Sequence, residues 1–223
     1  MVEKALIIVF SYFLGAIPVG VMVAKRFGFD ILASGSGNPG ATNVWRTVGP
    51  RAGKIVFLLD TLKGCIPAVA GLLLVHGSYA SVVGNGVDLP QRWGMFAGLA
   101  AVLGHTFSPF LKFKGGKGIA TAFGAGLGSV PLVALSAIAV FGVLLWITRY
   151  VSLSSIIAIA SAALFGFLFR VDWEVQIALW GLMVFVIFKH RANIARLRNG
   201  TESKFGLNHK TPPNQEARLD GEA

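Results

Sequence analysis

Long apolar runs constrain the fold of this chain more than any other feature. A hydrocarbon core of about 30 Å needs roughly 20 apolar residues per helix, and six candidate runs occupy residues 5–24, 55–75, 93–111, 119–148, 151–169 and 174–188. Only 13% of the 223 residues are charged, whereas soluble domains carry about 25%. The sequence therefore predicts an all-α, polytopic membrane protein.

The basic residues decide how these runs cross the membrane, because cytoplasmic loops carry an excess of lysine and arginine. If the first run crosses from outside to inside, the basic loops 25–54 and 112–117 are cytoplasmic and the loop 76–92 is external. A single crossing by residues 119–148 would then leave the segment from Lys189, with seven basic residues, on the outside. The charge pattern therefore favours two crossings in this run.

Three glycines followed by Pro131 provide a break, predicting a short helix 119–129 and a second helix 131–148. About seven membrane helices result, with the N-terminus outside and the C-terminus in the cytoplasm. The first helix of the split pair is short, so we expect it to be tilted or re-entrant. We expect residues 1–205 to form one membrane-embedded domain and residues 206–223 to be a disordered cytoplasmic tail.

Charge and composition exclude several other classes. The formal net charge is +10, but the basic residues lie between apolar runs rather than along one polar face, which favours membrane topology over nucleic-acid binding. The single cysteine, Cys65, forms no internal disulfide. The four histidines are scattered without clustered carboxylates, so we expect no metal and no cofactor. The N-terminal run lacks a basic start and a cleavage site, and we expect a retained span.

On this topology four polar stretches emerge on the same side of the membrane: residues 34–46, 112–118, 149–155 and 190–202. Residues that are far apart in the sequence would then line one basin at the cytoplasmic surface. A soluble phosphate compound could reach such a basin from the water, and an acyl chain could reach it from the bilayer.

The first stretch is rich in glycine and in hydrogen-bonding side chains. Gly40 and its neighbours allow tight turns that aim backbone N–H groups inward, while hydroxyl, amide and guanidinium groups could bind an anion. An interfacial loop that caps the next helix is the alternative interpretation. The candidate residues are Ser36, Asn38, Gly40, Thr42, Asn43 and Arg46.

The second stretch places Lys117 after Gly115 and Gly116, in a loop where glycine N–H groups could converge on an oxyanion. It lacks the Gly-x4-Gly-Lys-Ser/Thr spacing of a nucleotide-binding loop, so nucleotide hydrolysis is not supported. Lysines beside a span are often headgroup anchors, and we assign that role to Lys112 and Lys114 rather than to Lys117.

The remaining candidates lie at the start of the fifth run and after the sixth. His190 and Asn193 share a helical face, and Glu202 belongs to the same polar set. Ser155, with Ser152 and Ser154, either donates hydrogen bonds to a phosphate or caps a helix.

Two further features lie inside the apolar runs. His105 is either a packing residue or a functional one. Asp60 and Lys63 are spaced for an ion pair on one helical face, with a functional role as the second choice.

Three blocks together resemble the bacterial acyl-phosphate-dependent glycerol-3-phosphate acyltransferases. They are Ser36-Gly37-Asn38-Pro39-Gly40-Ala41-Thr42-Asn43 with Arg46; Gly104-His105-Thr106-Phe107-Ser108 through Phe113-Lys114-Gly115-Gly116-Lys117-Gly118; and His190-Arg191-Ala192-Asn193-Ile194 through Gly200-Thr201-Glu202. The resemblance covers residues 1–205 and implies a compact seven-helix enzyme of the bacterial inner membrane, with its active site facing the cytoplasm.

The resemblance implies transfer of a fatty acyl group from acyl phosphate to the 1-hydroxyl of glycerol 3-phosphate, giving lysophosphatidic acid and phosphate. The implied partners are these two substrates and membrane lipids, and a monomer is one expectation for the oligomeric state. The implied catalytic residues are Lys117, Arg46, Ser36 and His190. The implied substrate-binding residues are Asn38, Gly40, Thr42, Asn43, Gly115, Gly116, Ser155, Asn193 and Glu202.

Two other classes stay open at this point. A transporter for a phosphorylated solute would also surround an anion site with basic residues and broken helices, but the chain shows no internal repeat. A scaffold for lipid-synthesis partners would not require the glycine-lysine loop. The short outward loops, 76–92 and 170–174, contain few basic residues, which favours a one-sided enzyme.

Overall fold

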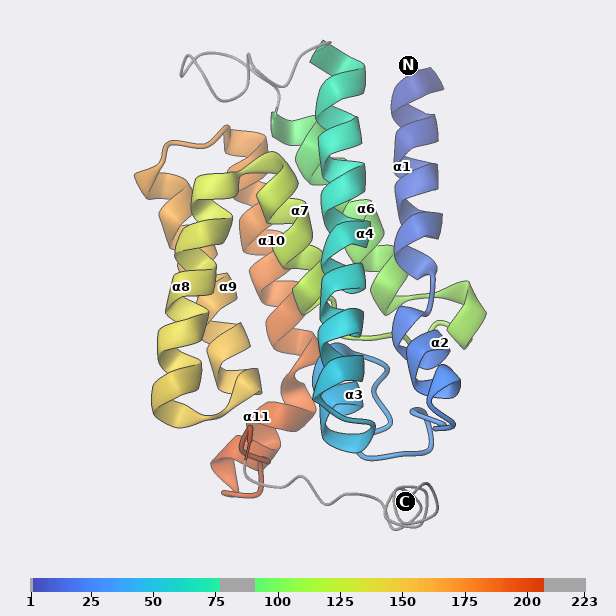
Figure 1. The fold of residues 1–223 in the computed structure, drawn as a ribbon. Coiled ribbons are helices and arrows are strands. Elements are labelled where there is room, and N and C mark those ends of the chain that lie inside the picture. Colours follow the sequence, from blue (N-terminus) through green and yellow to red (C-terminus); the bar gives the residue numbers. More distant parts are fainter. Residues whose placement is uncertain (1, 77–90, 207–223) are drawn as a thin grey trace.

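The computed structural model describes residues 2–76 and 91–206, and all regular structure within them is helical (Figure 1). The tail expected beyond residue 206 and most of the 76–92 loop lie outside the described residues. The elements are α1 (Val2–Ala16), α2 (Val19–Arg26), α3 (Ala41–Thr47), α4 (Pro50–His76), α6 (Gln91–Thr106), the 3-10 helix η1 (Pro109–Leu111), α7 (Ile119–Ser129), α8 (Pro131–Thr148), α9 (Val151–Leu168), α10 (Trp173–Lys189) and α11 (Arg191–Arg198).

Five segments of the described chain are long and apolar enough to cross a membrane, and the bent pair α10–α11 makes a sixth if it is counted as one span. The expectation of about seven helices includes α7, which is a shorter apolar helix of 11 residues. The predicted break is confirmed, since α7 ends at Ser129 and α8 begins at Pro131. A proline at the first helical position starts a helix without the loss of a hydrogen bond.

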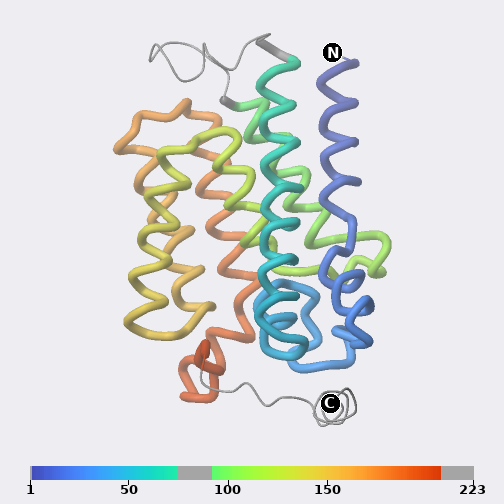
Figure 2. Tube along the Cα trace, in the orientation of Figure 1, coloured from blue at the N-terminus to red at the C-terminus, as the bar shows by residue number. Residues whose placement is uncertain are grey.

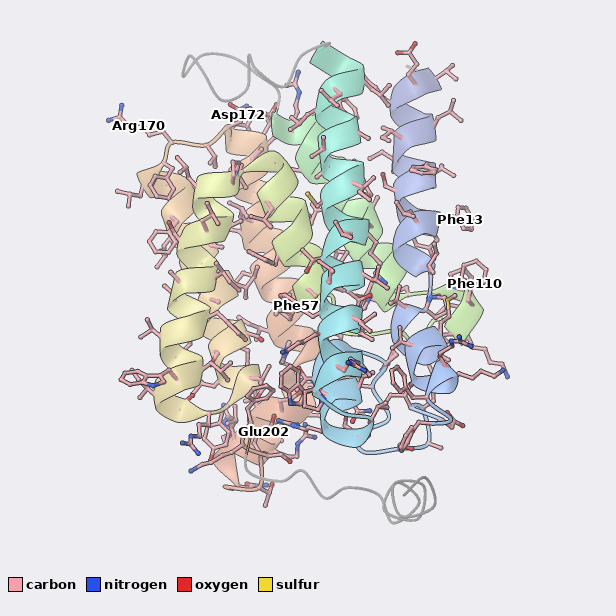
Figure 3. All side chains as sticks on the ribbon, viewed as in Figure 1. Phe13, Phe57, Phe110, Arg170, Asp172 and Glu202 are labelled. Carbon is pink, nitrogen blue, oxygen red and sulfur yellow. The ribbon has the colours of Figure 1, made fainter. Side chains whose placement is uncertain are left out.

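Successive long helices alternate in direction through the bundle (Figure 2). One end of the bundle carries α2, α3, α11 and the turn between α8 and α9, whereas the opposite end carries the N-terminus and the connection from α9 to α10. Figure 3 labels Glu202 at the first of these ends, and Arg170 and Asp172 at the other. We call the first end the Glu202 end.

The short helix α7 is covered by protein. It packs against α4, α6 and α8, and its contact with α4 is a direct approach of two backbones. A Cβ atom at Gly64 would overlap the carbonyl oxygen of Thr121, and a Cβ atom at Gly124 would overlap that of Thr61. Small residues at such crossings let membrane helices pack closely. Neighbouring helices therefore shield α7, as a short or re-entrant segment requires.

The first expected span consists of two helices rather than one. Helix α1 ends at Ala16, and Pro18 lacks the N–H group that a continuous helix would need. The carbonyl oxygens released at the break are hydrogen-bonded elsewhere: Ser108 Oγ donates to Ala16 O at 2.6 Å, and Lys63 Nζ donates to Ile17 O at 3.1 Å. The break is therefore stabilised by side chains from two other parts of the chain.

The outer surface of the bundle carries large apolar side chains. Trp146 is 83% exposed and Trp173 is 70% exposed. A bilayer, unlike water, accommodates such side chains, and tryptophan is enriched at membrane interfaces. The interior between α6, α8, α9 and α10 contains a buried cluster of Met95, Val130, Val133, Ala162, Ala163, Val175 and Leu179.

Candidate functional site

A polar basin opens at the Glu202 end, and all four predicted polar stretches contribute to its walls. The predicted convergence is therefore observed. The lining residues are Ser36, Asn38, Gly40, Ala41, Thr42, Asn43, Arg46, Phe57, Asp60, His105, Lys117, Gly118, Ile119, Ala120, Phe141, Val151, Ser152, Ser155, His190, Asn193, Arg196 and Glu202.

The segment before α3 is held in shape by an amide side chain. Asn43 Oδ1 accepts a hydrogen bond from Ser36 N at 3.0 Å, while Asn43 Nδ2 donates to Ser34 O at 3.0 Å and to Ile31 O at 3.4 Å. Asn38 Oδ1 accepts from Gly40 N at 2.9 Å. The polar atoms of Asn43 are thus used inside the protein, so this residue shapes the wall on which Ser36 sits.

Arg46 brings an unused donor to the basin. It lies on α3, and its Nη2 donates to Ser203 O at 2.9 Å. Its Nε is buried and has no hydrogen-bond partner among the described residues. Burial lowers the pKa of Arg46, the charge of Glu202 raises it, and the charge of Arg196 lowers it further. A buried guanidinium donor without a partner is costly, and the residue that carries it lines the basin.

The glycine-lysine loop differs from expectation in one respect. The N–H groups of Gly115 and Gly116 donate to Thr106 O at 3.0 Å and to His105 O at 3.1 Å. These bonds satisfy carbonyls at the end of α6, so the two N–H groups do not converge on an oxyanion, and neither glycine lines the basin. The loop reaches the basin through Lys117 and Gly118, as predicted, but the expected role of these two N–H groups is wrong.

The N-terminus of α7 is a donor group that sequence reasoning missed. Gly118, with φ +80, is the residue before α7, and Gly118, Ile119 and Ala120 line the basin. The first N–H groups of a helix have no partner within the helix, and the helix dipole makes this end attractive to anions. The sequence did contain a signal for this helix start, namely Gly118 followed by the apolar run that begins at Ile119.

Lys117 points into the basin from this loop. Its Nζ donates to Asn193 Oδ1 at 2.5 Å. Burial lowers the pKa of Lys117 to about 8; the charge of Glu202 opposes this shift, and the charges of Arg196 and Arg46 add to it. A partly buried ammonium surrounded by other cations is stabilised when an anion binds.

His190 and Asn193 lie at the bend of 59° between α10 and α11. His190 Nδ1 is 2.8 Å from Val186 O, and since a carbonyl only accepts, Nδ1 carries the proton and Nε2 is the nitrogen available to a ligand. Asn193 Nδ2 donates to Glu202 Oε1 at 2.7 Å. Both residues line the basin, as predicted.

Glu202 is an anchor for protein groups. Its carboxylate accepts hydrogen bonds of 2.7 Å each from Ser152 Oγ, Asn193 Nδ2 and Arg196 Nε. Burial raises the pKa of this carboxyl, but the three hydrogen bonds and the charge of Arg196 outweigh burial and lower it overall. Both of its carboxylate oxygens accept from protein donors, so Glu202 joins α9 to α11 and orients Asn193.

The serines at the start of α9 do not cap it. The residue before α9 is Tyr150, with no capping side chain. Ser154 Oγ donates to Tyr150 O and Ser155 Oγ to Val151 O, each four residues back. The capping alternative is therefore wrong, and of these two serines only Ser155 lines the basin.

An apolar cavity adjoins the basin. Four residues line both: Phe57, Ile119, Phe141 and Ser155. From Ser155 the cavity follows α9 to Ala162, between α7, α8 and α10. A charged compound in the basin could therefore extend an apolar chain into this cavity. The sequence did not indicate that Phe57 and Phe141 line the basin, because a phenylalanine that faces a cavity cannot be distinguished by sequence from one that faces lipid or another helix.

Among residues 2–76 and 91–206 no group of three or more His, Cys, Asp or Glu side chains could hold a metal ion. The ion pair expected at Asp60 and Lys63 is confirmed, with Oδ1 and Nζ 2.9 Å apart. Asp60 and His105 both line the basin, although neither was among the preferred site residues.

The fold and the basin define the class: an integral membrane protein in which a cation-lined basin opens beside an apolar cavity. The family model described as glycerol-3-phosphate acyltransferase matches residues 5–200. A protein of that name from Geotalea daltonii is 42% identical, covering 92% of this chain and 99% of its own length. Another from Bacillus subtilis is 43% identical, covering 90% and 96%.

Solved structures agree with this match. The crystal structure of PlsY (YgiH), an integral membrane glycerol 3-phosphate acyltransferase in its glycerol 3-phosphate form, is 41% identical with a TM-score of 0.80, covering 92% of this chain and 96% of that one. A lysophosphatidic acid form of that protein has a TM-score of 0.78. This chain belongs to the glycerol-3-phosphate acyltransferase family. It is an acyltransferase, not the transporter or scaffold that the sequence had left open.

Proposed function

We propose that the protein transfers a fatty acyl group from an acyl phosphate to the 1-hydroxyl of glycerol 3-phosphate, giving lysophosphatidic acid and inorganic phosphate. The observation that carries this proposal is the wall shared by the basin and the apolar cavity. A phosphate group fits the cation-lined part and an acyl chain fits the apolar part. Their junction, at Phe57, Ile119 and Ser155, is where the reacting carbonyl would lie.

The reaction balances without a protein nucleophile. The hydroxyl oxygen of glycerol 3-phosphate forms a bond to the acyl carbon, the bond from that carbon to the phosphate oxygen breaks, and the hydroxyl proton moves to the departing phosphate. An acyl phosphate is a mixed anhydride with a good leaving group, so alignment and charge neutralisation supply the catalysis.

Four residues contact the substrates in this proposal. Lys117 and Arg46 offset the charge of the phosphate groups, supported by the unpartnered Nε of Arg46. Ser36 donates a hydrogen bond from the wall that Asn43 shapes, and His190 acts through Nε2.

The remaining candidates have supporting roles. Asn193 orients Lys117, and the polar groups of Thr42 and Ser155 line the substrate path. Glu202, Asn38, Gly40, Gly115 and Gly116 shape the basin.

The proposed topology places the basin at the cytoplasmic face of the bacterial inner membrane, with the N-terminus outside and α7 counted as a seventh membrane segment. The positive charge of the loops at the Glu202 end supports this orientation. We propose a monomer as the catalytic unit, since a single chain by itself supplies both the cationic residues and the apolar cavity that the proposed reaction needs.

The direct test uses purified protein with palmitoyl phosphate and glycerol 3-phosphate, followed for lysophosphatidate and inorganic phosphate in equal amounts. Palmitoyl-CoA and palmitoyl-acyl-carrier protein serve as comparison donors. We expect turnover with acyl phosphate and none with the two thioesters. Equal turnover with a thioester donor would contradict the proposed donor while leaving the family assignment intact.

The KM for glycerol 3-phosphate should depend on pH through Lys117. Burial lowers the pKa of this amine to about 8 in the free protein, so the ammonium is present below that pH and is lost above it. A phosphate monoester, with its second pKa near 6, stays a dianion above neutrality. We expect a constant KM up to about pH 8 and an increase approaching about tenfold per unit above it. Initial rates between pH 7 and 9.5 check this, and a constant KM throughout would contradict it.

A further inference from the structure

A buried polar cluster of Asp60, Lys63 and His105 lies at the inner wall of the basin, which Asp60 and His105 line. Asp60 and Lys63 are 2% and 5% exposed. Asp60 Oδ1 is 2.9 Å from Lys63 Nζ and 3.7 Å from His105 Nδ1. Charges inside a membrane protein are costly and mark functional positions more often than chance. The mechanism above uses none of these three residues.

His105 touches the glycine-lysine loop through both its backbone and its ring. Its carbonyl oxygen accepts from Gly116 N at 3.1 Å. A Cβ atom at Gly116 would overlap Nε2 of the His105 ring, and a Cβ atom at Gly115 would overlap its carbonyl oxygen. The two glycines therefore lie directly against His105, with no space for any side chain. The position of the ring sets the position of the loop.

Lys117 comes directly after Gly116 in the chain, and the residue after it, Gly118, also contacts α6. Gly118 has φ +80, and a Cβ atom there would lie 2.9 Å from Val102 Cγ1. The backbone of Lys117 is therefore clamped between two contacts with α6, at His105 and at Val102. From this backbone position its ammonium donates a hydrogen bond to Asn193.

Asp60 lies beside the His105 ring, with Oδ1 at 3.7 Å from Nδ1. Both side chains are buried, and Nδ1 faces the carboxylate while Nε2 faces Gly116. Lys63 balances the charge of Asp60 and is itself fixed by its hydrogen bond to Ile17 O, at the break between α1 and α2. The contacts thus form a continuous series from the break in the first span to the basin.

We propose that Asp60 and His105 are positioning residues that hold the 115–118 loop, and through it the Lys117 ammonium, at the place where the phosphate of the acceptor binds. The role assigned to Lys117 rests on the proposed function. The positional claim itself concerns this chain alone and is testable without turnover.

A double-mutant cycle between His105 and Gly116 tests the claim by kinetics. We expect H105A to raise the KM for glycerol 3-phosphate about 30-fold and G116A about 100-fold, with smaller effects on kcat. Because the same contact is broken in both, the double variant should be no worse than G116A rather than worse by the product. Multiplicative effects would overturn the proposal, as would an unchanged KM in H105A.

Leu72→Ala is the control for general loss of packing. Leu72 is buried on α4, the helix that carries Asp60, and does not line the basin. This variant should lower thermal stability without changing KM. If L72A raises KM as H105A does, the effect of H105A is structural and the proposal fails.

Asp60 needs two variants, because D60N leaves Lys63 without its counter-charge. We expect D60N to raise KM for the acceptor about tenfold, and D60N combined with K63M to keep that increase while recovering stability. Recovery of a normal KM in the double variant would show that the unpaired lysine, not the contact with His105, caused the loss.

NMR of 13C-labelled lysine side chains gives a readout that does not need a substrate, with the Lys117 signal assigned by K117R. In the unchanged chain its pKa should be about 8, and in H105A it should move towards the ordinary 10.5 as the amine leaves the buried basin. A Lys117 titration that is identical in H105A overturns the inference. A shifted titration in a protein that does not acylate glycerol 3-phosphate overturns the proposed function instead.

Discussion

Lys117→Ala is expected to reduce turnover of acyl phosphate and glycerol 3-phosphate by about 10³-fold or more, the effect of removing a preorganised charge from a buried reaction site. The ammonium lies among Arg46, Arg196 and Asn193, where two phosphate groups must meet in the proposed reaction. Initial rates of lysophosphatidate formation measure the loss, and the melting temperature in detergent checks that the variant is folded.

Lys114→Ala is the matched control. It removes a lysine from the same loop, three residues earlier, but Lys114 is exposed and does not line the basin. We expect its activity to stay within about twofold of the unchanged chain, because exposed surface changes have small effects. Comparable losses in both variants would show that the loop matters for folding or membrane contact rather than through Lys117.

Ala162→Phe is expected to select against long acyl donors. Ala162 is buried in the apolar cavity, two helical turns beyond Ser155 at the basin. A phenyl ring there should exclude the last three or four methylene groups of a palmitoyl chain, at about 0.8 kcal/mol each. The expected loss is about 100-fold in kcat/KM for palmitoyl phosphate, with octanoyl phosphate changed by less than about threefold.

The ratio of the two donors within one variant removes any effect of a smaller folded fraction. Leu164→Phe provides the control, because Leu164 lies on the same helix, is 60% exposed and does not line the cavity. It should leave the ratio unchanged. An unchanged ratio in A162F would mean that the acyl chain lies elsewhere.

Much of the architecture could be predicted because the thickness of the bilayer sets the length of an apolar span, and the basic residues of the loops set its orientation. The break at Pro131 followed from the excess of basic residues after Lys189, and the structure places it there. Counting membrane crossings from the placement of basic residues also predicted that the stretches of Arg46, Lys117 and His190 emerge on one side. In the structure these residues line one basin. The break in the first span at Pro18 was missed, since an apolar run with one proline can still be continuous.

The individual donors of the site were predicted less well. Gly115 and Gly116 were expected to offer N–H groups to a phosphate, yet those groups satisfy the end of α6. Glu202 was expected to bind substrate; it lines the basin, and its carboxylate accepts hydrogen bonds from Ser152, Asn193 and Arg196, which the sequence did not indicate. In each case the segment lies at the basin as predicted, but the folded chain pairs these polar groups with other groups of the protein.

The sequence by itself determined that the protein is a helical membrane protein, which of its segments meet at one end, and which motifs it shares with its family. These properties depend on summed apolar area and charge along the chain. Only the tertiary structure decided which polar groups remain free for a ligand, because a hydrogen bond requires two groups within about 3 Å, and a sequence does not give the distance between two side chains. Within residues 2–76 and 91–206, Arg46 Nε has no hydrogen-bond partner, whereas the N–H group of Gly116 has one.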